Sequence, residues 1–462
     1  MSSFFIADML LGCRMERMCR VRLMSVEPGT ARDTVFAEFM DIITGGYGIM
    51  INSGDTGFMM VCTALVFFMT PGLAFFYGGL SRRKNVGNTM MSSVFIMGVC
   101  AVMWVAVGYS LSFAGNHGGI IGGFSSLFMN NIGWEPGTYS DGIPALLFAA
   151  FQMMFALITP ALITGAIAGR MKFKALFFFI IFWSLLVYYP LAHMVWGSGG
   201  FLAELGSVDF AGGNVVHISS GVSGLVAAIV LGKRTGYNQI NIRPHSVPLV
   251  VLGGSMLWFG WFGFNAGSAL AADGLAVHAF MTTNTSAAMG MITWMMMDVI
   301  KSGKPTVIGA VTGAVLGLVA ITPGAGFVPL WSAIIIGGLV SPICYFSVSV
   351  IKKKFGYDDA LDAFGCHGIG GVWGGIATGL FGKNSINSVA QWDGLVFGDT
   401  HLFTAQIISI AVTIAIAIAG TLICLGLTRL ITPLRVSEHD EKLGLDITEH
   451  GETAYPSFNG LD

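Results

Sequence analysis

Charged side chains are scarce in this sequence. Asp, Glu, Lys and Arg make up only 10% of its 462 residues, whereas a soluble domain carries roughly 25%. Hydrophobic residues account for 54%. This composition excludes an ordinary soluble domain and indicates a polytopic protein of the lipid bilayer. The formal net charge of −2 gives no indication of nucleic acid as a partner.

Signatures of metal binding and catalysis are also lacking. The seven cysteines form no CxxC pair. Apart from Cys366, no Cys, His or carboxylate stands at ligand spacing from the two histidines discussed below, so we expect no metal and no other cofactor. The glycine-rich stretch 365–375 lacks GxGxxG spacing and a preceding strand, so it is not a phosphate loop. No nucleophile–base pair stands out, and we do not expect an enzyme.

Long apolar runs begin at Thr56. Each has roughly the 20 residues that a helix needs to cross the hydrocarbon core. The sequence therefore predicts an all-α fold with eleven transmembrane helices, at 56–80, 87–113, 143–169, 172–194, 211–232, 246–270, 275–299, 306–322, 327–351, 365–382 and 402–432.

Basic residues gather in every second loop between these spans. They are Arg82, Arg83, Lys84, Arg170, Lys172, Lys174, Lys233, Arg234, Arg243, Lys301, Lys304, Lys352, Lys353 and Lys354. On the other side only Lys383 is basic. Because basic loops stay in the cytosol, we predict that the first span begins outside and that the C-terminus is cytosolic.

An odd number of spans suggests five, then five inverted, then one, since a tandem five-span repeat has inverted topology. Residues 56–432 form the predicted transmembrane domain, and residues 433–462 a polar cytosolic tail. Residues 1–55 form an N-terminal extension that is basic and has no clean signal-peptide core. It is either poorly ordered or precedes the true start of translation, and we assign it no function.

Two related stretches stand in the two halves: DFAGGNVVHISSG, which begins at Asp209, and DALDAFGCHGIGG, which begins at Asp359. In each, a histidine follows the aspartate by eight residues, at His217 and His367. Eight helical residues rise about 12 Å. Entry into a core of about 30 Å from opposite faces leaves the two imidazoles only about 6 Å apart in depth. An ionisable residue inside a span indicates a functional site.

The chemistry of these residues leaves alternatives open. Neutral imidazoles can donate from one nitrogen and accept at the other, so a pair can line a path for a small polar molecule, or relay a proton. They could instead be unrelated core histidines, each bonded to a carbonyl. Asp209 could cap a helix, stabilise a cation, or do both.

Trp196 and Ser268 fall at the predicted outer end of their spans. An aromatic face attracts a cation within about 6 Å, although a tryptophan here could equally belong to the interfacial aromatic belt. Phe155 and Phe264, taken alone, would be ordinary core or lipid-facing residues.

Taken together, several stretches resemble the ammonium transporters of the Amt/Mep/Rh superfamily, most closely the bacterial Amt type. The likeness covers about residues 56–455. The matching stretches are PGLAFFYGGLSRRKNV (71–86), AHMVWGSGG (192–200), DFAGGNVVHISSG (209–221), WFGFNAGSA (261–269), DAFGCHGIGG (362–371) and GLDITEHGETAY (444–455).

The resemblance implies an eleven-span fold of inverted repeats that assembles as a homotrimer with one pore per subunit. It also implies a PII-type signal protein that meets the cytosolic face. It implies that Trp196, Phe155 and Ser268 form an outer ammonium recruitment site, with Phe155 and Phe264 as a stacked gate beneath it. It implies that His217 and His367 are the paired pore histidines and that Asp209 is a required aspartate. Gln152 and Trp261 flank these positions.

We therefore predict an ammonium transporter in the cell inner (plasma) membrane that moves NH4+ or NH3. One alternative is an ammonium sensor with the same fold, although no appended signalling domain follows residue 455. Another is an Rh-type channel for NH3 or CO2. Trp196 and Ser268 resemble the Amt type and disfavour that second alternative.

Overall fold

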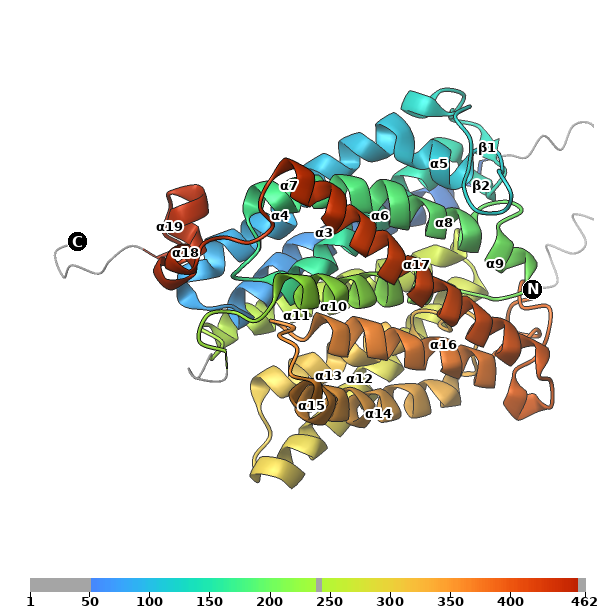
Figure 1. Cartoon of the computed structure of the whole chain (residues 1–462). Helices are drawn as coiled ribbons and strands as arrows, with labels where there is room; N and C mark the ends of the chain where they lie inside the picture. The colour runs from blue at the N-terminus through green and yellow to red at the C-terminus, as the bar shows by residue number, and fades with distance from the viewer. Residues whose placement is uncertain (1–50, 238–242, 456–462) are drawn as a thin grey trace, which may run out of the picture. The chain divides into compact units, whose positions relative to one another are not determined.

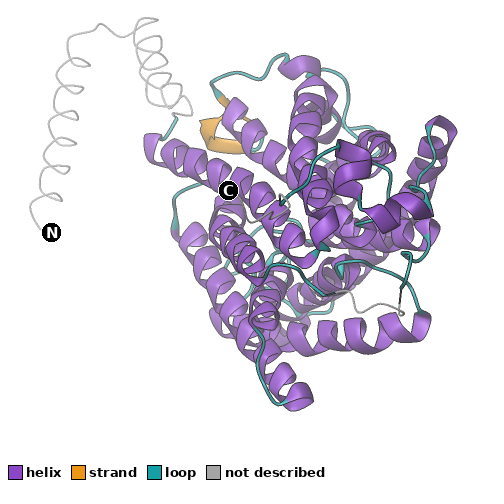
Figure 2. Ribbon diagram, turned by 90° about the vertical axis from the view of Figure 1, so that its left-hand side faces the viewer, coloured by secondary structure: helices purple, strands orange, loops and turns teal. Residues whose placement is uncertain are grey.

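The computed structural model describes residues 51–237 and 243–455. Within these ranges the chain is largely helical and has one short antiparallel hairpin (Figure 2). The chain divides into two units, Met1–Ile51 and Asn52–Asp462. Most of the predicted extension, up to residue 50, lies outside the described residues. Every helix and strand named below belongs to the second unit.

The helices follow one another as in Figure 1. The first half holds α3 (Ser53–Leu80), α4 (Val86–Met103), α5 (Tyr109–Phe113), α6 (Ala145–Ile167), α7 (Phe173–Trp183), α8 (Tyr189–Trp196), α9 (Phe201–Glu204) and α10 (Ser219–Leu231). The second half holds α11 (Val247–Ala266), α12 (Gly274–Ser302), α13 (Val307–Ile321), α14 (Leu330–Phe346), α15 (Lys352–Phe355), α16 (Ile369–Phe381), α17 (His401–Ile431), α18 (Glu438–Leu443) and α19 (Leu445–His450).

Shorter elements connect or extend these helices. The π-helical segments are η2 (Trp104–Gly108), η4 (Ser184–Tyr188), η5 (Gly213–Ile218), η7 (Ser347–Ile351) and η8 (Phe364–Gly368). The 3-10 turns are η1 (Arg83–Asn85), η3 (Leu127–Met129), η6 (Gly267–Ala269) and η9 (Leu395–Phe397), and the hairpin consists of β1 (Pro136–Gly137) and β2 (Ser140–Pro144).

Each apolar run predicted to cross the membrane corresponds to a helical segment. Among the described residues, eight helical stretches are long and apolar enough to span a bilayer, and α13 is a shorter apolar helix. The two remaining runs correspond to α12 and to η8 with α16. The structure is thus an all-α, multi-pass membrane fold, while the count of eleven crossings stays a prediction.

The two Asp–His stretches meet where η5 and α10 cross η8 and α16. A Cβ atom on Gly221 would overlap the backbone nitrogen of Gly368, and one on Gly371 would lie 3.1 Å from Cβ of His217. Gly221 thus lies opposite Gly368, whereas the earlier residue His217 lies opposite the later residue Gly371. The two segments therefore run antiparallel. At this crossing α10 packs against η8 and α16 packs against η5, and Figure 1 shows α17 lying obliquely against α10 and α16.

The basic loops come together at one end of the helices. Arg234 donates to the carboxylate of Asp358 through Nε at 2.8 Å and Nη2 at 2.7 Å. Arg170 is fully buried and donates to the carbonyl of Asp358. From the tail, Arg435 pairs with Glu441 at 2.6 Å and donates to two carbonyls at the end of α10. We take this end as the predicted cytosolic one and the opposite end as the outer one.

The C-terminal tail is folded onto this basic end as far as residue 455. The backbone N–H of Asn88 donates to Asp446 at 2.8 Å. The N–H of Leu445 donates to the side chain of Asn85 at 2.9 Å. These bonds attach α19 to the start of α4, so the described part of the tail is an ordered element. The domain boundaries drawn from the sequence stay predictions.

Candidate functional site

Aromatic and imidazole rings form a continuous line through the helices. It begins at Trp196, the last residue of α8, whose ring stands edge-on to Phe155 with centroids 5.9 Å apart. Phe155 on α6 lies 4.3 Å from Phe264 on α11. His217 follows 6.2 Å from Phe264, and His367 lies 5.3 Å from His217. We call these five residues the ring line. Both halves of the chain contribute to it.

The two imidazoles at the end of the ring line are stacked and almost completely buried. Their planes are inclined by 22°. Within the described part of the chain, neither nitrogen of His217 has a hydrogen-bond partner, and Nδ1 of His367 has none either. The alternative of two core histidines, each bonded to a carbonyl, is therefore wrong for His217. Buried polar atoms without partners are rare and demand an explanation.

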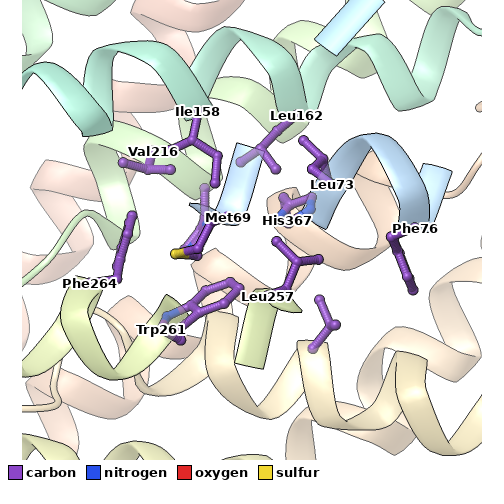
Figure 3. Close-up of a pocket in the computed structure, with 12 residues that line it drawn as sticks. Met69, Leu73, Phe76, Ile158, Leu162, Val216, Leu257, Trp261, Phe264 and His367 are labelled. Carbon is purple, nitrogen blue, oxygen red and sulfur yellow. The ribbon is translucent and has the colours of Figure 1, made fainter. Parts of the chain in front are cut away.

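A small cavity lies beside the imidazole pair. Its volume is about 10 Å³, close to the minimum that holds one water-sized molecule, roughly 10–15 Å³. Figure 3 shows His367, Trp261 and Phe264 around it, and apolar side chains such as Leu257 and Leu162 complete the wall. An apolar wall disfavours a bare ion and favours a small neutral molecule, which the two imidazoles can bond.

Asp209 caps the π-helical segment that carries His217. The backbone N–H groups of Gly212, Gly213 and Asn214 donate to its carboxylate at 2.9, 2.6 and 2.8 Å. The carbonyl of Asp209 also accepts from Nε1 of Trp196 at 2.9 Å. The capping role that the sequence left open is therefore present. The same residue joins the outer start of the ring line to the segment that positions its imidazole.

Asp359 performs the equivalent task in the second half. The N–H groups of Ala363 and Phe364 donate to its carboxylate at 3.0 and 2.8 Å. Burial raises the pKa of Asp359, and the nearby charge of Asp362 raises it further. Asp362 itself pairs with Lys352 at 2.6 Å. Asp359 thus caps η8, and Asp362 forms an ion pair beside it.

The chain is similar to known proteins over most of its length. The model of the Ammonium Transporter Family matches residues 57–455. The chain belongs to the ammonium transporter family. An ammonium transporter of Bacillus subtilis (strain 168) is 53% identical over 402 residues, which cover 87% of this chain and 98% of that protein. Such relatives are transporters and not enzymes.

Solved structures of the ammonium transporter family share the fold. The crystal structure of Saccharomyces cerevisiae Mep2 matches with a TM-score of 0.78 and 37% identity, covering 84% of this chain and 88% of that chain. A protein described as a sensor Amt protein matches with a TM-score of 0.78 and 29% identity, covering 86% of this chain and 98% of that chain. The family fold is therefore used by a protein described as a sensor as well.

Trp261 lies beside the ring line on the same helix as Phe264. Its ring is 5.4 Å from that of His217, with the two planes inclined by 27°. Nε1 of Trp261 donates to the hydroxyl of Thr322 at 2.9 Å. This bond fixes the indole, which in turn supports the imidazole from one side.

Two further predicted residues flank the phenylalanine pair. The hydroxyl of Ser268 donates to the carbonyl of Phe264 at 2.9 Å, so Ser268 stands one turn beyond Phe264 toward the outer end. Gln152 lies almost one turn before Phe155 on α6. Its buried Oε1 has no hydrogen-bond partner among residues 51–237 and 243–455. The structure thus brings all the predicted site residues to one region.

Two residues not expected from the sequence, His193 and Asn116, hold the turn after Trp196. His193 contacts the carbonyl of Ser112 at 3.0 Å through Nδ1, and Oδ1 of Asn116 at 3.2 Å through Nε2. Asn116 in turn donates to the carbonyl of Gly199 at 3.0 Å. In the sequence, His193 stands three residues before Trp196, almost one helical turn. That spacing was the sequence feature that could have indicated its role.

Proposed function

We propose that this protein transports ammonium across a membrane and recruits NH4+ at the outer end of the ring line. The supporting observation is an indole and a phenyl ring at this end, with the hydroxyl of Ser268 in η6, the turn that follows α11. The faces of Trp196 and Phe155 attract a cation by about 0.5–2 kcal/mol, and the hydroxyl oxygen of Ser268 can accept a hydrogen bond from it.

Beyond this site the substrate crosses as NH3. The observation that carries this proposal is the buried imidazole pair with unpartnered nitrogens beside a cavity of about 10 Å³. A charged ammonium would lose its hydration there at a cost of many kcal/mol, whereas ammonia loses far less. We place the loss of the proton near Asp209, above the Phe155–Phe264 gate.

Uptake into proteoliposomes tests the proposal. An inward ammonium gradient should change internal pH quickly with wild-type protein and at the rate of empty liposomes with His217→Leu, provided that the variant melts near the wild-type temperature. His401→Gln serves as the matched control, because this exposed histidine lies outside the ring line. Equal rates for wild type and His217→Leu would contradict the proposed path.

The route of the released proton needs a separate measurement. The proton either returns to the outer solution, or follows through the imidazoles and gives net charge movement. Ammonium pulses on a solid-supported membrane distinguish the two. A transient current that His217→Leu abolishes means proton transfer through the pair, and no current in vesicles with active uptake means electroneutral transport.

A sensor is the second candidate function. Its specific support is the 29% identity to a protein described as a sensor Amt protein. Growth of a transporter-deficient yeast on low ammonium separates the two. Rescue by the wild-type chain, and failure of its His217→Leu variant at equal expression, supports transport, while normal folding without rescue supports sensing.

We also propose a homotrimer in the cell inner membrane, with a PII-type protein as its cytosolic partner. Support comes from family membership and from the large apolar side chains exposed on α3, α11 and α12, which need either lipid or a neighbouring subunit. Native mass spectrometry of the detergent-solubilised protein should give a mass of three chains. Pull-down with a PII-type protein from the same cells tests the partner.

A further inference from the structure

A second cavity lies near the outer end and shares no lining residue with the cavity of the imidazole pair. Its volume is about 480 Å³, and it is bounded by α5, the start of α6 and the segment between them. Sites for small organic molecules occupy roughly 300–1,000 Å³. The proposed path of ammonium leaves this cavity without a role.

One wall of the cavity is a packed aromatic cluster. The rings of Tyr139 and Phe148 stack at 5.0 Å with an angle of 5°. Phe113 stands edge-on to both, with its centroid 5.1 Å from each. Tyr109 completes the cluster at 5.7 Å from Phe113. Mutual packing holds these rings in place, and aromatic faces attract cations.

Glu135 gives this cavity a negative charge, and no Lys or Arg is among its described lining residues. Glu135 lines the cavity, is exposed, and forms no ion pair with any residue that the structure describes. The sequence has no Lys or Arg between Lys84 and Arg170. The other polar groups of the lining are neutral and come from Ser125, Ser126, Asn131, Thr138 and the two tyrosines.

We propose that this cavity binds a small organic cation from the outer side, a methylated or quaternary ammonium ion. Its volume of about 480 Å³ is many times the roughly 10–15 Å³ that a water-sized molecule needs, so a cation larger than ammonium fits better. Methyl groups would pack against the rings of the aromatic cluster, and the positive charge would face Glu135.

The cavity is connected to the recruitment site by one hydrogen-bonded residue. The hydroxyl of Tyr139 donates to the carbonyl of Phe113 at 2.9 Å and accepts from the N–H of Ser198 at 3.0 Å. Ser198 belongs to the turn that follows Trp196. A cation in contact with Tyr139 therefore restrains this turn, and we expect it to lower the maximal rate of ammonium uptake without competing for the ammonium site.

Calorimetric titration of the full-length purified protein tests binding. The probe is choline, and the control ligand is its neutral isostere 3,3-dimethylbutan-1-ol. Choline should bind at least about 10-fold more tightly than the isostere. Equal affinity for the two, or no choline binding, would overturn the proposal.

Variants locate the site. Glu135→Gln should weaken choline binding about 10-fold and leave ammonium uptake unchanged, while Asp141→Asn, an exposed carboxylate of the same segment outside the cavity lining, should leave binding unchanged. Tyr139→Leu should weaken binding and Tyr139→Phe should retain it, because only the first removes the ring. Unchanged binding in Glu135→Gln would contradict the proposal.

The cation could be free or belong to a lipid headgroup. Titration in nanodiscs of phosphatidylglycerol alone, and in nanodiscs that also contain phosphatidylcholine, distinguishes the two. Choline binding that disappears with phosphatidylcholine assigns the site to the headgroup, and binding that persists assigns it to the free cation.

Discussion

Asp209 could be found from the sequence, but its role could not be assigned from it. Its position at the start of a span fitted both a helix cap and a group that stabilises a cation. The structure shows three short N–H bonds to its carboxylate. Capping is therefore present, and substitution must decide whether the charge also serves transport.

We expect Asp209→Ala to lose uptake and to lower the free energy of unfolding by about 1–3 kcal/mol, because four N–H groups lose their acceptor. Asp209→Asn keeps one acceptor oxygen, so it should fold nearly as well and still lose uptake. Melting temperature and proteoliposome uptake measure both effects. Asp273→Asn, which changes the helix-capping aspartate of α12, is the control. Normal uptake in Asp209→Asn would reduce its role to capping.

Trp196 is the second residue whose proposed role requires contact with the substrate. Trp196→Leu removes the indole face, so we expect KM for ammonium to rise about 2- to 30-fold, with little change in the maximal rate. Uptake at several ammonium concentrations measures this. Trp331→Leu, a change at a half-exposed tryptophan outside the ring line, should leave KM unchanged. A fall in maximal rate alone would instead indicate a role in the gate.

The helices were predictable from the sequence because each apolar run has the length of a membrane span. The π-helical segments η5 and η8 were not, because one extra residue in a turn leaves no clear periodic pattern. The β1–β2 hairpin was missed for a similar reason. It lies in a glycine-rich loop and has no alternating strand pattern. The elements that carry His217 and border the outer cavity, η5 and the β1–β2 hairpin, were thus among those that the sequence predicted least well.

The antiparallel crossing of α10 and α16 depends on glycines without side chains. Gly221→Ala should push the two segments apart, because the added Cβ overlaps backbone of Gly368. We expect a loss of about 1–3 kcal/mol in stability and slower uptake, measured by thermal melting and liposome assay. Gly426→Ala in α17, where an added Cβ has nothing within 4 Å, should change neither. Equal melting of both variants would contradict this account of the crossing.

The basic end joins parts of the chain that are distant in sequence. Asp358 connects the turn after α6, through Arg170, with the end of α10, through Arg234. Burial alone would raise the pKa of Asp358, but the hydrogen bonds and positive charges of Arg234, with the charge of Arg170, lower it below its usual value. The folded state therefore favours the ionised carboxylate.

A lowered pKa gives stability that is present above the unfolded pKa, about 3.9, and is lost as pH falls through that range toward the folded value. We expect the wild-type melting temperature to fall steeply below about pH 4. Asp358→Asn should lower stability at pH 7 by about 3 kcal/mol, because it leaves Arg170 buried and unpaired, and should flatten the acid limb. Asp141→Asn is the control. If the melting temperature of Asp358→Asn fell below pH 4 as steeply as that of the wild type, Asp358 would be excluded as the cause of the acid sensitivity.

The ring line could be predicted only in part from the whole chain. Entry of the two Asp–His stretches from opposite faces predicted that His217 and His367 lie at similar depth. In the structure their ring centroids are 5.3 Å apart. The roles of Trp196, Phe155 and Phe264 came from the family resemblance, because single aromatics in a membrane protein have many uses. The spacing of His193 from Trp196 was visible in the sequence, but its partners Ser112 and Asn116 were not, because these contacts join segments that are about 80 residues apart.

The chamber beside the imidazoles has room for about one water-sized guest, at 10 Å³. Two molecules cannot occupy it together, so on the proposed path ammonia passes this point one molecule at a time. A methyl group adds volume that the packed wall does not leave free, so on the proposed path we expect methylamine to pass more slowly than ammonia. We therefore expect uptake rates measured with a methylated tracer to be lower than those of ammonium, even where the tracer competes well for the proposed outer site.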